Sequence, residues 1–156
     1  MGDWESDTVV GKGRASYIAS HVERKSRYTV IAKMKDKSAK SMNAATKRAF
    51  RKIPTEKLKT MTFDNGKEFA GFKELEKSLS IRSYFAHAYS SWERGTNENT
   101  NGLLRQFFPK RTDFHQVSQW LLDKVEELLN NRPRKCLNYR TPAEVFWRVK
   151  ICCASG

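Results

Sequence analysis

The hydrophobic and polar positions of the chain change their period several times, and the first third follows a strand-like pattern. β-branched and aromatic residues dominate residues 3–10, 16–23 and 27–34, with Gly11, Gly13 and a short polar segment between them. Such runs, separated by turn residues, are typical of strands joined by short connections. We therefore predict three strands in an antiparallel meander.

A helical period begins in residues 38–52. Met42, Ala45 and Ala49 recur at intervals of three to four positions, and Pro54 follows the segment. Apolar residues at this spacing, closed by a proline, favour an amphipathic helix. We expect this helix to follow the meander directly.

The next three segments alternate in period. Residues 58–63 have the alternation of a strand, residues 69–79 carry apolar side chains on one helical face, and residues 81–86 alternate again. A strand, a helix and a strand in that order predict a parallel crossover. The sheet is therefore expected to be mixed.

The last third of the chain, beyond residue 95, is helical in pattern. The helix starts are predicted by Asp113 with Gln116, and by Thr141 followed by Pro142 and Glu144. A first apolar stripe contains Leu103, Leu104 and Phe107. A second stripe contains Val117, Trp120, Leu121, Val125, Leu128 and Leu129.

This order of elements predicts the fold class. The pattern itself supports an α/β protein with a mixed sheet, and the succession of strands and helices is the order expected of an RNase H-like fold, with five strands flanked by helices. A chain of 156 residues that is 38% hydrophobic is long enough to bury one core. We expect a single domain over residues 1–156.

Charge and cysteine content narrow the class of partner and compartment. With 30 Lys and Arg against 17 Asp and Glu, the net charge is +13, and the basic residues are spread along the chain, which favours nucleic acid as a partner. The apolar runs are shorter than a membrane span. Cys136, Cys152 and Cys153 lack the spacing of a zinc site or disulfide framework, so we expect reduced thiols in a cytoplasmic protein.

Three acidic residues are candidates for chemistry. Asp7 interrupts a strand-like run, Asp64 ends the strand before the turn pair Asn65 and Gly66, and Glu98 begins a helix. Sites gather at strand ends in open α/β sheets. Carboxylates there suit a pair of Mg²⁺ ions, which stabilise both the attacking and the leaving oxygen of a phosphodiester.

Each candidate also has an ordinary structural interpretation. Asp64 fits an ordinary turn, Asp7 a solvent-facing strand position, and Glu98 the positive end of a helix dipole. Other acids compete for a metal-ligand role, namely Glu5, Glu23, Glu68 and Glu93. The residue pattern alone leaves these alternatives open.

Four segments carry a resemblance to a known family. They are WESD at residues 4–7, FDNGKEF at 63–69, YFAHAYSSWERGTNENTNGLLRQFFP at 84–109 and NNRPRKCLNYRTPAEVFW at 130–147. Together they resemble the catalytic core of DDE transposases of the insertion-sequence thirty family, relatives of retroviral integrases. The similarity covers nearly the whole chain.

The resemblance implies a catalytic and metal-binding triad of Asp7, Asp64 and Glu98, with two Mg²⁺ ions, for which Mn²⁺ can substitute. The interval from Asp64 to Glu98 is 98 − 64 = 34 positions, similar to the family spacing, which makes Glu68 and Glu93 improbable third ligands. The family usually has Gly at position 6, Pro at 88 and Gly at 111, where this chain has Ser, Ala and Arg. None of these departures removes a carboxylate, so we expect an active enzyme.

Several residues around the triad are predicted to contact DNA. Trp92 is placed to stack on a base, or to pack within its loop. Lys67, Arg94 and Arg105 are placed to meet phosphates, with Arg105 on the helical face of Glu98. The other predicted DNA-binding residues are Asn65, His87, Asn97, Asn101 and Lys110. No role is predicted for His21 or His115.

The implied function is cleavage of DNA at insertion-sequence ends followed by strand transfer into target DNA. The alternatives are a metal-dependent nuclease of the same fold and a non-catalytic DNA-binding module. The family's N-terminal helix-turn-helix region is expected to be absent, which would weaken binding to specific ends. We further expect a homo-oligomer on DNA, no membrane partner, and a nucleoid-associated protein of the bacterial cytoplasm.

Overall fold

The computed structural model of the chain describes residues 1–87 and 95–148. Its strands are β1 (Asp3–Val10), β2 (Tyr17–Glu23), β3 (Thr29–Met34), β4 (Thr60–Phe63) and β5 (Arg82–Phe85). Its α-helices are α1 (Ala39–Phe50), α2 (Phe72–Leu79), α3 (Gly95–Phe107), α4 (Gln119–Asn130) and α5 (Pro142–Trp147). The predicted order of elements is confirmed, with strand ends within about two residues of the predicted ones.

The five strands form one mixed sheet in the order β3-β2-β1-β4-β5. β1, β2 and β3 pair antiparallel, whereas β1 with β4 and β4 with β5 pair parallel. The meander and the parallel crossover are both confirmed. β1 is thus the central strand, with an antiparallel neighbour on one side and a parallel neighbour on the other.

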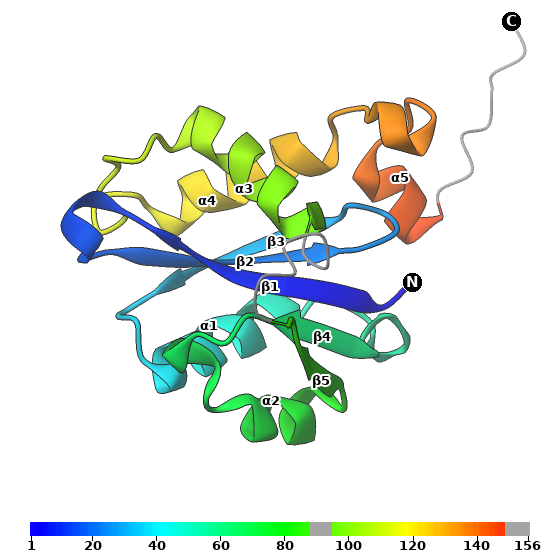
Figure 1. Ribbon diagram of the computed structural model, residues 1–156. Coiled ribbons are helices and arrows are strands. Elements are labelled where there is room, and N and C mark those ends of the chain that lie inside the picture. Colours follow the sequence, from blue (N-terminus) through cyan, green and yellow to red (C-terminus); the bar gives the residue numbers. More distant parts are fainter. Residues whose placement is uncertain (88–94, 149–156) are drawn as a thin grey trace, which may run out of the picture.

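Helices cover both faces of this sheet (Figure 1). α1 and α2 lie on one face, and α3 and α4 lie on the other. α5 lies next to α4, and its Phe146 packs edge-on against Trp4 with ring centroids 5.7 Å apart. Trp4 also meets Phe50 of α1 at 4.7 Å. These aromatic contacts fix the start of β1 in the core.

Local capping explains where the helices begin. Ser38 Oγ accepts a hydrogen bond from Ser41 N at the start of α1. At α5, Thr141 and Glu144 form the predicted capping box, with Pro142 in the first turn. Within the described ranges, 1–87 and 95–148, no helix is long and apolar enough to cross a membrane.

The predicted start of α4 is wrong. The Asp113 carboxylate accepts from His115 N in a tight turn, and the helix begins later, after Ser118, whose hydroxyl accepts from Leu121 N. A short-range hydrogen bond from an Asp side chain competes with helix initiation. The predicted apolar stripe is half right, because Val117, Val125 and Leu129 are buried.

The buried face of α4 consists of Leu122, Val125 and Leu129, whereas Trp120, Leu121 and Leu128 are exposed. The stripe predicted on α3 is also partly wrong, because Phe107 is exposed and Phe108 is buried with Leu104. In both helices the sequence offers apolar residues on more than one face, so spacing alone does not select the buried one.

Candidate active site

The site is built on the central strand. Successive residues of β1 point to opposite faces of the sheet. Trp4 enters the core under α1, while Glu5, Asp7 and Val9 face α3. The predicted first carboxylate therefore lies on the face that α3 covers.

Asp7 is half-buried and held by defined donors. Its Oδ1 accepts from Thr8 N at 2.8 Å, and its Oδ2 accepts from Asn101 Nδ2 of α3 at 2.8 Å. The Asn101 amide is oriented in turn by Ser20 Oγ of β2, which donates to Asn101 Oδ1 at 2.8 Å. Asp7 is thus fixed by a chain of hydrogen bonds that ties α3 to two strands.

Asp64 follows the last residue of β4. The parallel register pairs Glu5 with Thr62, and Asp7 and Asp64 each come two residues later along the same pair of strands. Neighbouring strands are about 4.8 Å apart, so Asp7 within β1 and Asp64 just after the end of β4 lie next to each other and on the same face. Asp64 Oδ1 accepts from Gly66 N at 2.8 Å, which fixes the turn after the strand.

Glu98 is exposed in the first turn of α3. It precedes Asn101 by three positions, and residues at this spacing are neighbours on a helix surface, about 5–6 Å apart at Cβ. Because the Asn101 side chain bonds to Asp7 of β1, Glu98 lies on the same side of α3 as this contact. Within residues 1–87 and 95–148, no group of three His, Cys, Asp or Glu side chains is placed to hold a metal ion.

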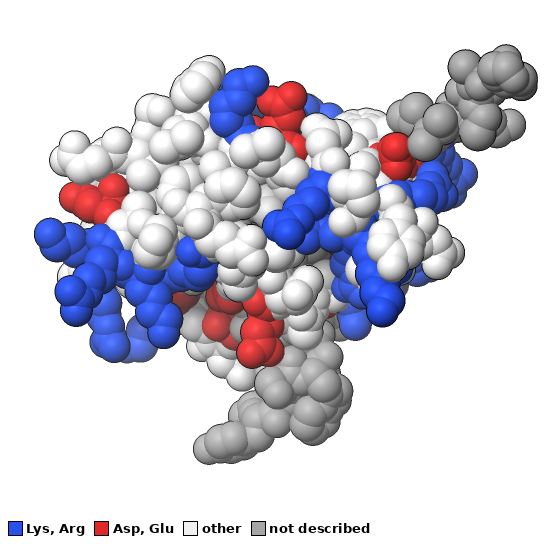
Figure 2. Space-filling view, turned by 90° about the horizontal axis from the view of Figure 1, so that it is seen from above, with Lys and Arg blue, Asp and Glu red and all other residues white. Residues whose placement is uncertain are grey.

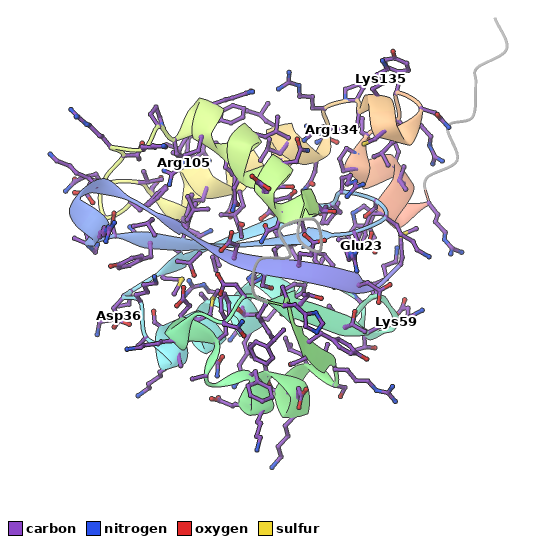
Figure 3. All side chains as sticks on the ribbon, viewed as in Figure 1. Glu23, Asp36, Lys59, Arg105, Arg134 and Lys135 are labelled. Atoms are coloured by element: carbon purple, nitrogen blue, oxygen red, sulfur yellow. The ribbon has the colours of Figure 1, made fainter. Side chains whose placement is uncertain are left out.

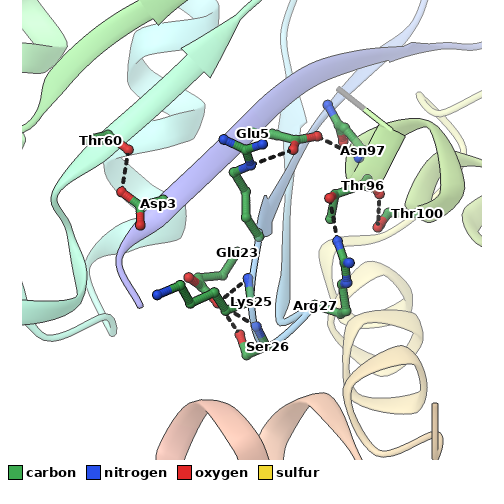
Figure 4. A network of polar contacts seen from close by, with 11 residues as sticks. Asp3, Glu5, Glu23, Lys25, Ser26, Arg27, Thr60, Thr96, Asn97 and Thr100 are labelled. Carbon is green, nitrogen blue, oxygen red and sulfur yellow. Dashed lines mark hydrogen bonds and ion pairs between the residues drawn. The ribbon is translucent and has the colours of Figure 1, made fainter. Parts of the chain in front are cut away.

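The first turn of α3 is anchored by buried charge (Figure 4). Glu5, only 1% exposed, accepts from Asn97 N at 2.8 Å. Arg24 Nε lies 3.1 Å from Glu5 Oε1, an ion-pair distance, although no donor of the described residues reaches that oxygen in hydrogen-bond geometry. Arg27 donates to Thr96 Oγ1 in the same turn. β1 and the turn after β2 together set where the helix bearing Glu98 begins.

The other acids considered as metal ligands have structural surroundings. Buried Glu23 accepts from Gly2 N, Ser26 N and Ser26 Oγ, and so holds the β2–β3 turn. Glu68 is buried and pairs with Lys37 Nζ at 3.6 Å. Glu93 lies outside the described residues. Glu5 and Glu23 are thus fully used by the fold.

The predicted DNA-binding residues divide by exposure. Four lie exposed near the carboxylates or at the far end of α3, and they are Asn65, Lys67, His87 and Lys110. Asn97 differs from the prediction, because its side chain is completely buried and offers no surface to DNA. Asn101 orients Asp7. Trp92 and Arg94 lie outside the described residues.

Arg105 extends along β1 from α3 (Figure 3). Its guanidinium donates to Val10 O at 2.8 Å and reaches Phe108 O at 3.5 Å. The side chain is half-buried, and burial lowers the pKa of Arg105 from its ordinary value. The structure therefore gives Arg105 a structural role at the end of β1, whether or not it also meets a phosphate.

Surface charge is arranged around this face. Figure 2 looks down on the side that carries α3 and α4, and shows Lys and Arg side chains gathered on both sides of a group of Asp and Glu side chains. The Lys and Arg side chains on both sides would attract a polyanion, whereas the acidic group between them would repel it unless cations bind there.

A buried polar pair lies behind the site. Ser6, in place of the family's glycine, is 2.7 Å from His21 Nδ1 through its hydroxyl, and Thr46 Oγ1 is 3.4 Å from His21 Nε2. Burial lowers the pKa of His21 to about 3, so the ring is neutral. Sequence reasoning missed this role, because a lone histidine in a strand carries no signal of its partners.

With the geometry in place, the chain can be compared with known proteins. The family model of the integrase core domain matches residues 1–91, more than half of the chain. The chain belongs to the integrase core domain family. It is 47% identical to the transposase InsI for insertion sequence element IS30A of Escherichia coli K12, over 95% of this chain. This confirms the resemblance to the insertion-sequence thirty family.

Solved structures agree on the fold of this integrase core. The catalytic core domain of BIV integrase has a TM-score of 0.68 at 16% identity, covering 94% of each chain. A chain of a simian T-cell lymphotropic virus intasome, in complex with PP2A regulatory subunit B56 gamma, has a TM-score of 0.72 at 18% identity, covering 96% of this chain and 55% of that one. The RNase H-like fold is thereby confirmed. The chain spans 38% of the length of InsI.

Proposed function

We propose that this integrase core is the catalytic domain of a DNA transposase, which cleaves phosphodiesters at insertion-sequence ends and joins the ends to target DNA. The observations that support the proposal are Asp7 on β1, Asp64 directly after the parallel neighbouring strand β4, and Glu98 in the first turn of α3, the helix whose Asn101 bonds to Asp7. Family membership and the net charge of +13 support DNA as the substrate. The proposed domain spans residues 1–156.

The carboxylates suit divalent cations of the Mg²⁺ or Mn²⁺ type. Oxygen donors are the ligands that Mg²⁺ prefers, and Asp7 and Asp64 supply them from rigid elements. Glu98 is exposed in the first turn of α3, and we propose that it turns toward Asp7 and Asp64 as the third ligand when the cations bind. When bound, two such ions would supply positive charge for both oxygens of the displaced phosphodiester.

The chain's own residues orient and hold the reacting groups. Asn101 leaves Asp7 one defined orientation, and Gly66 N does the same for Asp64. Such supporting hydrogen bonds typically change metal affinity or activity 10- to 100-fold when removed. Exposed Lys67 and Lys110 are proposed to hold phosphates of the DNA backbone.

The test is cleavage and strand transfer of a labelled duplex in Mn²⁺ or Mg²⁺. We expect Glu98→Gln and Asp64→Asn each to lower the rate about a hundredfold or more, because each removes a negative charge that would hold the divalent cations. Glu127→Gln is the matched control, since Glu127 is an exposed residue of α4 that pairs with Lys124 on the surface. Equal nicking by wild type and Glu98→Gln would sink the assignment.

A nuclease of the same fold would use the same carboxylates but only water as the nucleophile. A pre-cleaved end with a free 3′-hydroxyl separates the two functions, because only a transposase joins that end to a second duplex. A non-catalytic DNA-binding module would bind the duplex and yield neither product.

The finer proposals concern assembly and location. We propose that the chain assembles as a homo-oligomer on DNA, supported by its fold similarity to a chain of an intasome. Light scattering with and without DNA would measure this. We also propose a cytoplasmic, nucleoid-associated protein, which imaging of a fluorescent fusion would test.

A further inference from the structure

Within residues 1–87 and 95–148, no helix packs over one face of β4 and β5. Met61 and Phe63 of β4 are completely buried on the α1 and α2 side, so Thr60 and Thr62 point to the opposite face. α3 packs over β1 and β2 rather than over β4 and β5. Tyr84 of β5, on the same open face as Thr62, is 51% exposed. The floor of this face is therefore polar, with one accessible aromatic ring.

This open face forms a groove of about 430 Å³. It is lined by Asp3, Arg24, Thr60, Thr62, Tyr84, Phe85, Ala86 and His87. Thr60 Oγ1 donates to Asp3 Oδ1 at 2.8 Å, as Figure 4 shows, so that end of the groove is rigid. The Arg24 side chain is about half exposed beside the groove, although its Nε pairs with Glu5.

The groove runs directly into the proposed active site. Tyr84 is the register partner of Thr62, and Asp64 comes two residues after Thr62. A rise of about 3.3 Å per residue and a strand spacing of about 4.8 Å put the Cα atoms of Tyr84 and Asp64 about 8 Å apart. Bases stack at about 3.4 Å intervals, so this distance corresponds to about two nucleotides.

We propose that this groove holds an unpaired nucleobase of the DNA substrate, stacked on the ring of Tyr84 beside the phosphate at Asp7 and Asp64. The inference rests on the proposed function and names the form of DNA that the site takes. A base inside a duplex already has stacking partners, whereas an unpaired base gains one here. Threonine hydroxyls can bond to base edges, and Arg24 can meet the adjoining phosphate.

The composition of the groove argues for a nucleotide over a protein partner. A docking surface for a protein would present a contiguous apolar patch, whereas here the apolar Phe85 and Ala86 share the groove with hydroxyl, carboxylate and guanidinium groups around the ring of Tyr84. The net charge of +13 favours a polyanion. A single aromatic platform with cationic borders is how proteins bind single-stranded nucleic acid.

The experiment compares a blunt duplex with the same duplex carrying a short single-stranded tail, using fluorescence anisotropy with Ca²⁺ and the whole 156-residue chain. Tyr84→Phe keeps the ring, so we expect affinity for both DNAs within about twofold. Tyr84→Thr keeps strand propensity but removes the ring, and we expect tailed DNA to bind about 5- to 150-fold more weakly, with blunt DNA unchanged. Tyr139→Thr is the matched control, because Tyr139 is 71% exposed outside the groove.

A second readout places the base. 2-Aminopurine in the tail should be quenched by the wild-type chain and by Tyr84→Phe, and not by Tyr84→Thr. An equal loss for blunt and tailed DNA, no loss for either, or unchanged quenching would overturn the inference. Cleavage in Mn²⁺ separates the two proposals. If the wild-type chain cleaves DNA but Tyr84→Thr has no effect on the binding of tailed DNA, only the stacking site is refuted. If the chain binds tailed DNA selectively but does not cleave it, only the transposase is refuted.

Discussion

The buried carboxylate of Glu5 offers a sharp test of how this fold positions its site. Replacing Glu5 by Ala removes the acceptor for Asn97 N and the partner of Arg24 in one step. Asn97 is completely buried, so its backbone N–H has no access to water once the acceptor is gone. Arg24 is about half exposed and can be hydrated again at little cost.

The magnitude follows from these two surroundings. A hydrogen bond to a charged group contributes about 1.5–3 kcal/mol, and an unpaired buried donor costs about 1–3 kcal/mol, while the variant no longer buries a carboxylate. These opposing terms give a net loss of about 2 kcal/mol for Glu5→Ala. In a domain of this size that lowers Tm by about 4–8 °C. Glu5→Gln keeps an acceptor and should lose about half as much.

Urea unfolding followed by circular dichroism measures the loss, with Glu127→Ala as the matched control. Glu127 pairs with Lys124 on the exposed face of α4, so its removal should cost less than about 0.5 kcal/mol. A double-mutant cycle with Arg24→Ala should give a coupling energy of at least about 0.5 kcal/mol. If Glu5→Ala and Glu127→Ala were equally stable, Glu5 would not anchor α3.

Three further measurements test other parts of the structure. Burial lowers the folded-state pKa of His21 to about 3, below the ordinary 6.5, so between these pH values the unfolded chain binds one more proton than the folded chain. The free energy of unfolding is therefore unaffected by His21 above pH 6.5 and falls toward pH 3 by up to about 1.4 kcal/mol per pH unit. His21→Gln should flatten this slope in acid titrations of unfolding. Leu104→Ala should cost about 2–5 kcal/mol in urea unfolding, whereas Leu128→Ala, at a 57% exposed position, should stay within about 0.5 kcal/mol; similar costs would show that the helix phases are wrong. Asn101→Ala should raise the Mn²⁺ concentration for half-maximal cleavage about 10-fold or more, and Asn99→Ala, exposed on the same helix, should leave it unchanged.

Much of the fold could be predicted from local pattern. The change of period from two to 3.6 and back located the strands and most helices, and the capping box at Thr141 and Glu144 marked α5 within a residue. Such signals arise between residues a few positions apart, so they can be recognised without knowledge of tertiary contacts. The prediction of the start of α4 was wrong for the same reason. Asp113 and Ser118 are both residues that can cap a helix, and the local pattern does not show which of them does so.

The candidate site was predicted less completely. Asp7, Asp64 and Glu98 were identified as candidates from motifs. The prediction that Asn97 contacts DNA was wrong, because its side chain is buried, and the roles of Ser20 and Glu5 were not predicted. Ser20 and Asn101 are 81 positions apart, and Glu5 and Asn97 are 92 apart. No periodicity in the chain reports contacts of that range.

The sequence by itself determined the order of elements and the net positive charge, because each depends on residue type and short-range spacing, and its resemblance to a known family singled out the three candidate carboxylates. Only the tertiary structure decided which face of α3 meets the sheet. That face is polar in its first two turns, where Asn97 and Asn101 find partners on β1 and β2, and apolar only from Leu104 onward. Burying a polar group is costly without hydrogen bonds, and the partners of the Asn97 backbone N–H and of the Asn101 amide exist only once distant strands have paired.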